Sequence, residues 1–141
     1  MDYSTAILPL DERMHVAGQI SVADVALLAR DGFTTIINNR PDGETPDQPR
    51  HAAIEEAAQA HGLKVVAVPV ISGGPLDPAS IDAQRQAIET AGTGKVLAFC
   101  RSGTRSTIVW ALGQRGQRPA DETIALAAAA GYDLTPYRAM L

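Results

Sequence analysis

A cysteine, two arginines and three hydroxyl side chains lie together in one short segment, Cys100-Arg101-Ser102-Gly103-Thr104-Arg105-Ser106. The segment follows the apolar stretch 95–99, which predicts a short buried strand, and precedes the apolar stretch 107–112, which is typical of a helix. The N–H groups of a tight loop and of a helix N-terminus converge on one point and bind anions. The segment therefore predicts an anion-binding loop between a strand and a helix.

Cys100 is the only cysteine of the chain, and we predict that it is a reactive nucleophile. Positive potential from the loop, the helix dipole, Arg101 and Arg105 stabilises a thiolate at this position. A lone cysteine in a soluble protein is more often a small buried hydrophobe. A structural cysteine, however, needs neither flanking arginines nor intervening hydroxyl groups. The surroundings therefore favour a nucleophile that acts on an anionic substrate.

The loop resembles the active-site loops of two enzyme groups, the rhodanese-type sulfurtransferases and the cysteine-dependent protein tyrosine and dual-specificity phosphatases. The phosphatases place five residues between the cysteine and the arginine, usually with a histidine before the cysteine. Here four residues separate Cys100 from Arg105, and Phe99 precedes the cysteine. This Cys-x4-Arg spacing is the rhodanese pattern. Its shorter loop suits a sulfur atom or a thiosulfate-sized group better than a phosphate ester.

The rest of the chain resembles the phosphatases. The stretch Asn38-Asn39-Arg40-Pro41-Asp42-Gly43-Glu44 is similar to the loop that follows an early strand in dual-specificity phosphatases. Over about residues 14–134 the chain resembles the phosphatase-like domain of the beta-lactamase-hydrolase-like proteins. That bacterial family is also described as a sulfurtransferase family, and it occurs alone or fused to persulfide dioxygenase domains of the metallo-hydrolase type. The resemblance implies a cysteine-phosphatase-like fold and a catalytic pair, Cys100 and Arg105.

On this basis we predict a rhodanese-type sulfurtransferase. Cys100 would take sulfane sulfur from thiosulfate or a glutathione persulfide, become a persulfide, and pass the sulfur to a thiol, cyanide or sulfite. The alternative is a phosphatase that works through a phospho-cysteine, with Arg105 holding the phosphoryl oxygens in a bidentate fork. A purely anion-binding module is a third hypothesis, which the intact cysteine and arginine disfavour.

Six further residues are candidates for substrate binding: Arg101, Ser102, Gly103, Thr104, Ser106 and Arg40. Arg101 would bind an anionic group at the mouth of the loop, or remain a solvated charge. Ser106 would hydrogen-bond the thiolate or the loop backbone, or cap the helix. Arg40 would sit beside the loop, or belong to a turn. The residues alone leave these alternatives open.

A phosphatase also uses a general acid to protonate the leaving oxygen, usually an aspartate after the preceding strand. No aspartate directly follows the strand-like residues 65–70. Asp77 is the nearest, but it precedes Pro78, and Asp at the N-cap with Pro at the first helical position is a preferred pair. For Asp42 we favour a turn over a role as the acid or as the partner of Arg105.

Composition limits the remaining classes. The 141 residues, 45% hydrophobic and 20% charged, predict one soluble domain over residues 1–141. A net charge of -4 argues against general nucleic-acid binding. The single thiol fits the reducing cytoplasm, and neither a signal peptide nor a membrane-length apolar run is evident. We therefore predict a cytoplasmic protein that binds neither nucleic acid nor membrane.

No cofactor or metal is predicted, because His15, His51 and His61 lack the spacing of metal ligands. The predicted partners are a small anionic sulfur or phosphate substrate and, from the resemblance, a persulfide dioxygenase.

The predicted elements alternate, which favours a three-layer α/β sandwich with a mostly parallel central sheet. Strands are predicted at 15–19, 33–37, 63–70 and 95–99, and helices between Ser21 and Gly32, at 50–61, at 78–91, after the cysteine loop as far as Gly116, and at 119–130. Cys100 leaves its strand at the carboxyl edge of the sheet, where such folds place ligand sites. The loops after Ile37 and around 72–74 are expected at the same edge.

Overall fold

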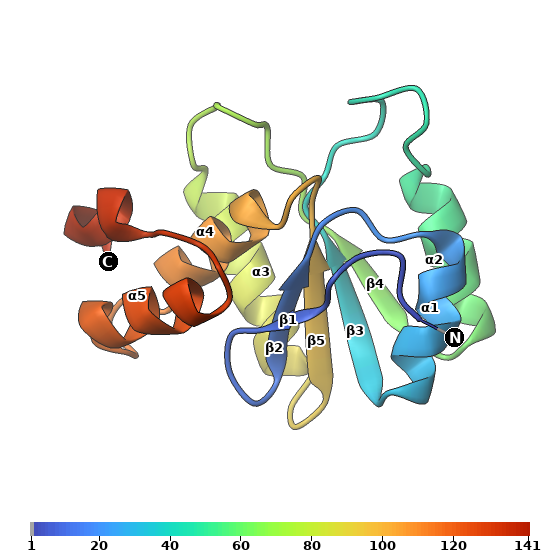
Figure 1. Ribbon diagram of the computed structural model, residues 1–141, viewed down its shortest axis with the longest axis horizontal. Coiled ribbons are helices and arrows are strands. Elements are labelled where there is room, and N and C mark those ends of the chain that lie inside the picture. The colour runs from blue at the N-terminus through green and yellow to red at the C-terminus, as the bar shows by residue number, and fades with distance from the viewer. Residues whose placement is uncertain (1) are drawn as a thin grey trace.

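The computed structural model describes residues 2–141 and contains one five-stranded sheet with the order β1-β2-β5-β3-β4 (Figure 1). The strands are β1 (Leu8–Pro9), β2 (Met14–Ala17), β3 (Phe33–Asn38), β4 (Lys64–Ala67) and β5 (Lys95–Phe99). β1 runs antiparallel to β2, and every other pair is parallel. The predicted mostly parallel sheet is confirmed.

Helices cover both faces of the sheet, as the three-layer prediction requires (Figure 1). The helices are α1 (Val22–Arg30), α2 (His51–Ala60), α3 (Pro78–Thr90), α4 (Thr104–Gly113) and α5 (Ala120–Ala129), with a 3-10 turn η1 (Thr135–Met140). In the figure α1 and α2 lie on one face, α3 and α4 lie on the other, and α5 packs outside α4. The strand that ends at the cysteine is thus enclosed between two helical layers.

The central strand β5 is buried on both faces. Val96 and Ala98 belong to the core cluster beneath α3, α4 and α5, which also holds the fully buried Trp110. Leu97 and Phe99 belong to the cluster beneath α1 and α2. This alternation follows from the two-residue period of a strand. Apolar packing on both sides therefore fixes the point at which the chain leaves the sheet.

Helix starts follow the predicted capping chemistry. Ser21 and Asp24 form a reciprocal capping box at α1, and the side chain of Asp77 accepts a hydrogen bond from the N–H of Ala79 at the start of α3. β4 ends at Ala67 rather than at residue 70. Its partner β3 ends at Asn38, so the regular ladder stops there, although the N–H groups of Val68 and Val70 still donate to the Asn38 and Asn39 carbonyls at 2.9 Å. The short edge strand β1, which contains a proline, was not predicted.

Candidate active site

Three loops meet at the carboxyl edge of the parallel strands, drawn at the top of Figure 1. They follow β3, β4 and β5, and they come together as the sequence predicts. Backbone hydrogen bonds join them: Asn39 N–H donates to the Phe99 carbonyl at 2.9 Å, and Val70 N–H donates to the Asn39 carbonyl at 2.9 Å. A fourth segment, after β2, joins them because Gln19 N–H donates to the Arg101 carbonyl at 3.2 Å. The cysteine loop is therefore held from both sides.

Cys100 lies at the floor of this edge. Its exposed fraction is 0%, so an incoming group reaches the sulfur only by entering the loop. The N–H of Gly103 donates a hydrogen bond to Sγ at 3.1 Å. Gly103 has φ +88°, a left-handed conformation that favours glycine, and it turns the chain into α4. The first N–H groups of α4 have no partner within the helix, so they are free to bind an anion beside the sulfur.

Tyr132, near the C-terminal end of the chain, contacts the cysteine loop. Its hydroxyl donates to the Ser102 carbonyl at 2.9 Å, and it lies where a side chain on Gly103 would have to stand. Burial and the nearby Cys100 raise the pKa of Tyr132. Sequence reasoning missed this residue, because nothing in the sequence signals a contact between positions 30 apart.

Arg105 is placed by three hydrogen bonds that leave one edge of its guanidinium free. Nη1 donates to Oε2 of Glu44 at 2.7 Å and to the Val70 carbonyl at 2.9 Å, and Nη2 donates to Oε1 of Glu44 at 2.9 Å. A guanidinium has five N–H groups. The Nε–H and the second Nη2–H therefore form a fork that neither Glu44 nor Val70 occupies.

Arg105 lies near the sulfur of Cys100. The pKa of Arg105 is raised, first by its hydrogen bond to Glu44 and then, against the opposing effect of burial, by the proximity of Cys100. Two adjacent N–H donors beside a cysteine sulfur match two oxygens of a tetrahedral anion. The site therefore brings together a cysteine sulfur, a loop of backbone donors and a cation able to form two parallel hydrogen bonds.

Sequence reasoning overlooked Glu44, which contacts two arginines at this edge of the sheet. Its carboxylate accepts two of the three hydrogen bonds that Arg105 donates, and a further one from Nε of Arg40 at 2.9 Å. The hydrogen bond from Arg105 is the main cause that lowers the pKa of Glu44 to about 2, from 4.5. Glu44 is thus a carboxylate at neutral pH. The sequence did contain a signal that could have identified Glu44: an acidic side chain in a loop that is expected at the same edge of the sheet as two arginines.

Arg40 lies beside the cysteine loop, which is one of the two placements that the sequence left open. Its side chain is only 4% exposed, and it donates to Glu44, to Gln19 Oε1 at 2.9 Å and to the Thr45 hydroxyl at 3.3 Å. Arg40 therefore supports Glu44 and the neighbouring loop.

The remaining candidates of the cysteine loop separate into exposed and buried positions. The hydroxyls of Ser102 and Thr104 are exposed and lie 3.0 Å apart. Arg101 is exposed, and within residues 2–141 its side chain makes no hydrogen bond or ion pair that the structure records. Ser106 is fully buried, and its Oγ has no hydrogen-bond partner among residues 2–141. Ser106 is therefore not a helix cap, since Gly103 occupies that position.

The two predicted alternatives for a general acid are engaged in capping. Asp77 caps α3, with its Oδ1 2.9 Å from the N–H of Ala79, and its side chain is exposed. Asp42 Oδ1 accepts the N–H of His51 at 2.8 Å, which caps the start of α2 in place of the N-cap residue. The cap that the sequence favoured for Asp77 matches its contact, and Asp42 lies in a turn, as predicted, with the cap of α2 as a further contact.

A buried amide network lies behind the loops. Nδ2 of Asn39 donates to Oε1 of Gln84 at 2.8 Å, and Nε2 of Gln84 donates to the Ser106 carbonyl at 3.3 Å. Gln84 has an exposed fraction of 0%. It therefore links the loop after β3 to the first turn of α4, which carries Arg105.

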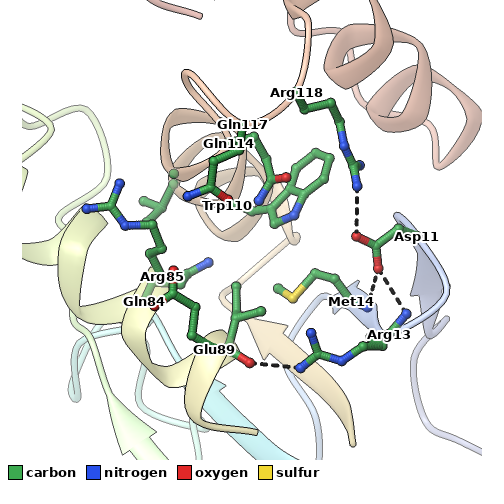
Figure 2. Close-up of a pocket in the computed structure, with 13 residues that line it drawn as sticks. Asp11, Arg13, Met14, Gln84, Arg85, Glu89, Trp110, Gln114, Gln117 and Arg118 are labelled. Atoms are coloured by element: carbon green, nitrogen blue, oxygen red, sulfur yellow. Dashed lines mark hydrogen bonds and ion pairs between the residues drawn. The ribbon is translucent and has the colours of Figure 1, made fainter. Parts of the chain in front are cut away.

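A cavity of about 220 Å³ opens at the opposite end of α4 (Figure 2). It is lined by Gly113, the last residue of that helix, and by Met14, the first residue of β2. Arg118 lies over Trp110 there, with 5.7 Å between the guanidinium carbon and the ring centroid, and pairs with Asp11 at 3.4 Å. This cavity lies at the other edge of the sheet from the cysteine.

Metal and membrane signals are absent from the part of the chain that the structure describes. Within residues 2–141 no group of three histidine, cysteine or acidic side chains gathers to hold a metal ion. Over the same residues, every helix is too short or too polar to cross a membrane.

Comparisons with known proteins point to one family. Its model, described as the phosphatase-like domain of the beta-lactamase hydrolase-like protein, matches residues 7–117. A beta-lactamase hydrolase-like protein of Xylella fastidiosa is 42% identical over 130 residues, which cover 91% of this chain and 30% of the relative. A Neisseria meningitidis crystal structure, described as a candidate phosphatase, matches with a TM-score of 0.79 and 35% identity over 94% of each chain. The kinase associated phosphatase shares the fold, with a TM-score of 0.73 at 16% identity over 99% of this chain and 93% of that one.

These findings confirm the recognised resemblance and the fold, and they overturn the predicted sulfurtransferase function. That prediction rested on the four-residue spacing between Cys100 and Arg105, whereas the similarity to phosphatase-type proteins extends over nearly the whole chain. The physical reason is that loop length alone does not define the anion site. Left-handed Gly103 turns its N–H onto the sulfur, and Glu44, which lies outside the loop, sets the position of the arginine.

Proposed function

The chain belongs to the phosphatase-like domain family of the beta-lactamase hydrolase-like proteins, and we propose that it is a cysteine-dependent phosphatase that hydrolyses phosphomonoesters. The observation that carries this proposal is that Arg105 lies near Cys100 and has an Nε and Nη2 edge that Glu44 and Val70 leave unused. The chain spans 30% of the length of the curated Xylella fastidiosa relative, so the proposal concerns this domain and not the longer protein.

In the first step the sulfur of Cys100 attacks phosphorus. A sulfur–phosphorus bond forms, and the bond from phosphorus to the ester oxygen breaks with its electron pair on that oxygen. The fork of Arg105 and the N–H groups at the start of α4 hold the equatorial oxygens of the phosphoryl group, where charge is spread in the transition state. Orientation by these fixed donors is the main catalytic contribution of the chain.

In the second step water attacks the phospho-cysteine. The sulfur–phosphorus bond breaks, inorganic phosphate leaves, and the electron pair returns to the sulfur of Cys100. We assign the unpartnered hydroxyl of Ser106 to this step, as a donor to the departing sulfur, since its Oγ is buried in the first turn of α4. The buried hydroxyl then gains the partner that it lacks.

Protonation of the leaving group determines which esters the site hydrolyses. The two candidate acids, Asp77 and Asp42, are engaged as caps, and Glu44 is ionised at neutral pH. A leaving oxygen without a positioned acid departs as an anion, which favours phenols over alcohols. The proposed substrates are therefore aryl phosphates.

The proposed partner is a small anionic phosphate-type substrate. The persulfide dioxygenase partner that the resemblance implied is not shown by the comparisons, so it is not part of the proposal. The cytoplasmic location stays a prediction.

Steady-state hydrolysis of an aryl phosphate, such as 4-nitrophenyl phosphate, tests the proposal. Replacing Cys100 with serine is expected to lower kcat by about four orders of magnitude or more, because the oxygen nucleophile is far weaker. Replacing Arg105 with lysine keeps the charge and removes the fork, with an expected loss of about 100-fold or more in kcat/KM. Turnover that survives in the serine variant would reject the proposal.

A further inference from the structure

A second, smaller cavity of about 190 Å³ opens beside the cysteine loop. Its lining residues are polar, apart from one proline: Gln19, Arg40, Thr45, Asp47, Gln48, Pro49 and Arg101. Arg101 directly follows Cys100 in the chain, and Arg40 shares Glu44 with Arg105. We call this cavity the side cavity. The carboxylate of Glu44 therefore lies between the side cavity and the anion site.

The walls of the side cavity are fixed by hydrogen bonds. Gln19 accepts from Arg40 at 2.9 Å, and its own Nε2 donates to the Ile20 carbonyl at 2.9 Å. Gln48 donates to the Pro41 carbonyl at 2.8 Å and accepts the N–H of Glu44 at 3.1 Å. Polar groups whose donors and acceptors are already paired can form few further hydrogen bonds to a ligand. The walls therefore shape the cavity and leave recognition to other side chains.

Two charged side chains of opposite sign remain for recognition. Arg101 is exposed and forms no ion pair in the part of the chain that the structure describes. Asp47 is also exposed, and the hydroxyl of Thr45 and then the charges of Arg40 and Arg101 lower its pKa. An unpaired cation and an unpaired anion at one cavity match a ligand group that carries both charges.

We propose that the side cavity binds an amino-acid group of the substrate, with Arg101 on its carboxylate and Asp47 on its ammonium. This inference rests on the proposed phosphatase function and names the class of phosphomonoester, one whose leaving group bears a free α-amino acid. A second phosphate or a carboxylate alone fits the cavity less well, because Asp47 repels it. An uncharged aryl group uses neither side chain.

Four substrates with the same phenolic leaving group test the assignment. They are phosphotyrosine, its N-acetyl derivative, its carboxamide, and the derivative with both groups blocked. Since the leaving oxygen is the same, differences in kcat/KM report on binding outside the anion site. Exposed ion pairs contribute modestly, so each free charge is expected to raise kcat/KM about two- to fivefold, mainly through KM.

Two variants assign the charges separately. Arg101→Gln is expected to remove the advantage of the free carboxylate and to keep that of the ammonium, and Asp47→Asn is expected to do the reverse. Arg115→Gln, at an exposed position outside the side cavity, is the matched control and should keep both advantages. Equal kcat/KM for all four compounds, or an advantage that survives in both variants, would overturn the inference.

Binding to the Cys100→Ser variant separates failure of the side cavity from failure of the phosphatase proposal. Calorimetric Kd values for the four compounds should follow the same order with no turnover. Cysteine-dependent hydrolysis with four equal Kd values would retain the phosphatase and reject the amino-acid cavity. Ordered Kd values without any hydrolysis by the unmodified protein would retain the cavity and reject the phosphatase.

Discussion

Replacing Glu44 with alanine removes the main anchor of Arg105, and we expect kcat/KM for an aryl phosphate to fall about 10- to 100-fold. The carboxylate accepts two hydrogen bonds from the guanidinium, at 2.7 and 2.9 Å. A hydrogen bond to a charged group contributes about 1.5–3 kcal/mol, and about 1.4 kcal/mol corresponds to a factor of ten in rate, so the expected range equals the net loss of one such bond, because the pair is partly solvated. The Val70 carbonyl keeps one contact with Arg105, so the loss is smaller than that expected for the nucleophile.

The same substitution also has a stability cost. Arg40, with a side chain only 4% exposed, loses its charged partner, and we expect about 1–2 kcal/mol of destabilisation because the ion pair is partly solvated. The folded-state pKa of Glu44, about 2, lies below its ordinary value of 4.5. A depressed carboxyl pKa stabilises the fold above about pH 4.5, and this contribution is lost as pH falls toward 2. The stability difference between the parent protein and Glu44→Ala should therefore shrink over that window.

Steady-state kinetics and urea unfolding test these two expectations. Glu56→Ala, at an exposed carboxylate on α2, is the matched control and should change neither quantity. Glu44→Gln keeps the shape and one acceptor, and is expected to lose less than the alanine variant. The reasoning would be refuted if Glu44→Ala lowered KM and raised kcat/KM, because Glu44 would then compete with the substrate anion for Arg105.

Three further outcomes are expected. Gln84→Leu should lower the free energy of unfolding in urea by about 1–3 kcal/mol, since it strands buried amide partners. Gln86→Leu, two residues along on the exposed face of α3, should be close to neutral, and equal effects would contradict the role of the network. Gly103→Ala should destabilise more than Gly116→Ala: both have positive φ, which costs about 1–2 kcal/mol, but only the first also meets the Tyr132 hydroxyl. In a series of phosphate esters, kcat/KM should rise steeply with the acidity of the leaving alcohol, and a flat dependence would show that a general acid operates.

The fold was predictable because its signals are local. Alternating strand and helix patterns, the capping box at Ser21 and the cap at Asp77 lie within a few residues of the elements that they define. The apolar run before Cys100 likewise predicts the central strand with its observed bounds. The end of β4 differs from the prediction, because the apolar residues continue to Val70 whereas the partner strand β3 ends at Asn38.

The candidate site was predictable only in part, because its geometry depends on distant contacts. Cys100 and Arg105 are recognisable from their spacing. The position of Arg105 depends on Glu44, which is 61 residues away, and the closure of the loop depends on Tyr132. The loop spacing alone favoured sulfur transfer. The contacts of Glu44 and Tyr132 with the loop could not correct that prediction, because they have no local signature in the sequence. Their absence from the sequence pattern explains why the fold was predicted correctly and the reaction was not.

A mass measurement on rapidly quenched protein tests the central claim most directly. The protein is mixed with an excess of 4-nitrophenyl phosphate, quenched in acid within the first turnover, and digested. The account predicts a gain of one phosphoryl group on the peptide that contains Cys100, with none in the Cys100→Ser variant. Active turnover with unmodified Cys100 at every quench time, and a phosphoryl group on another residue, would contradict it.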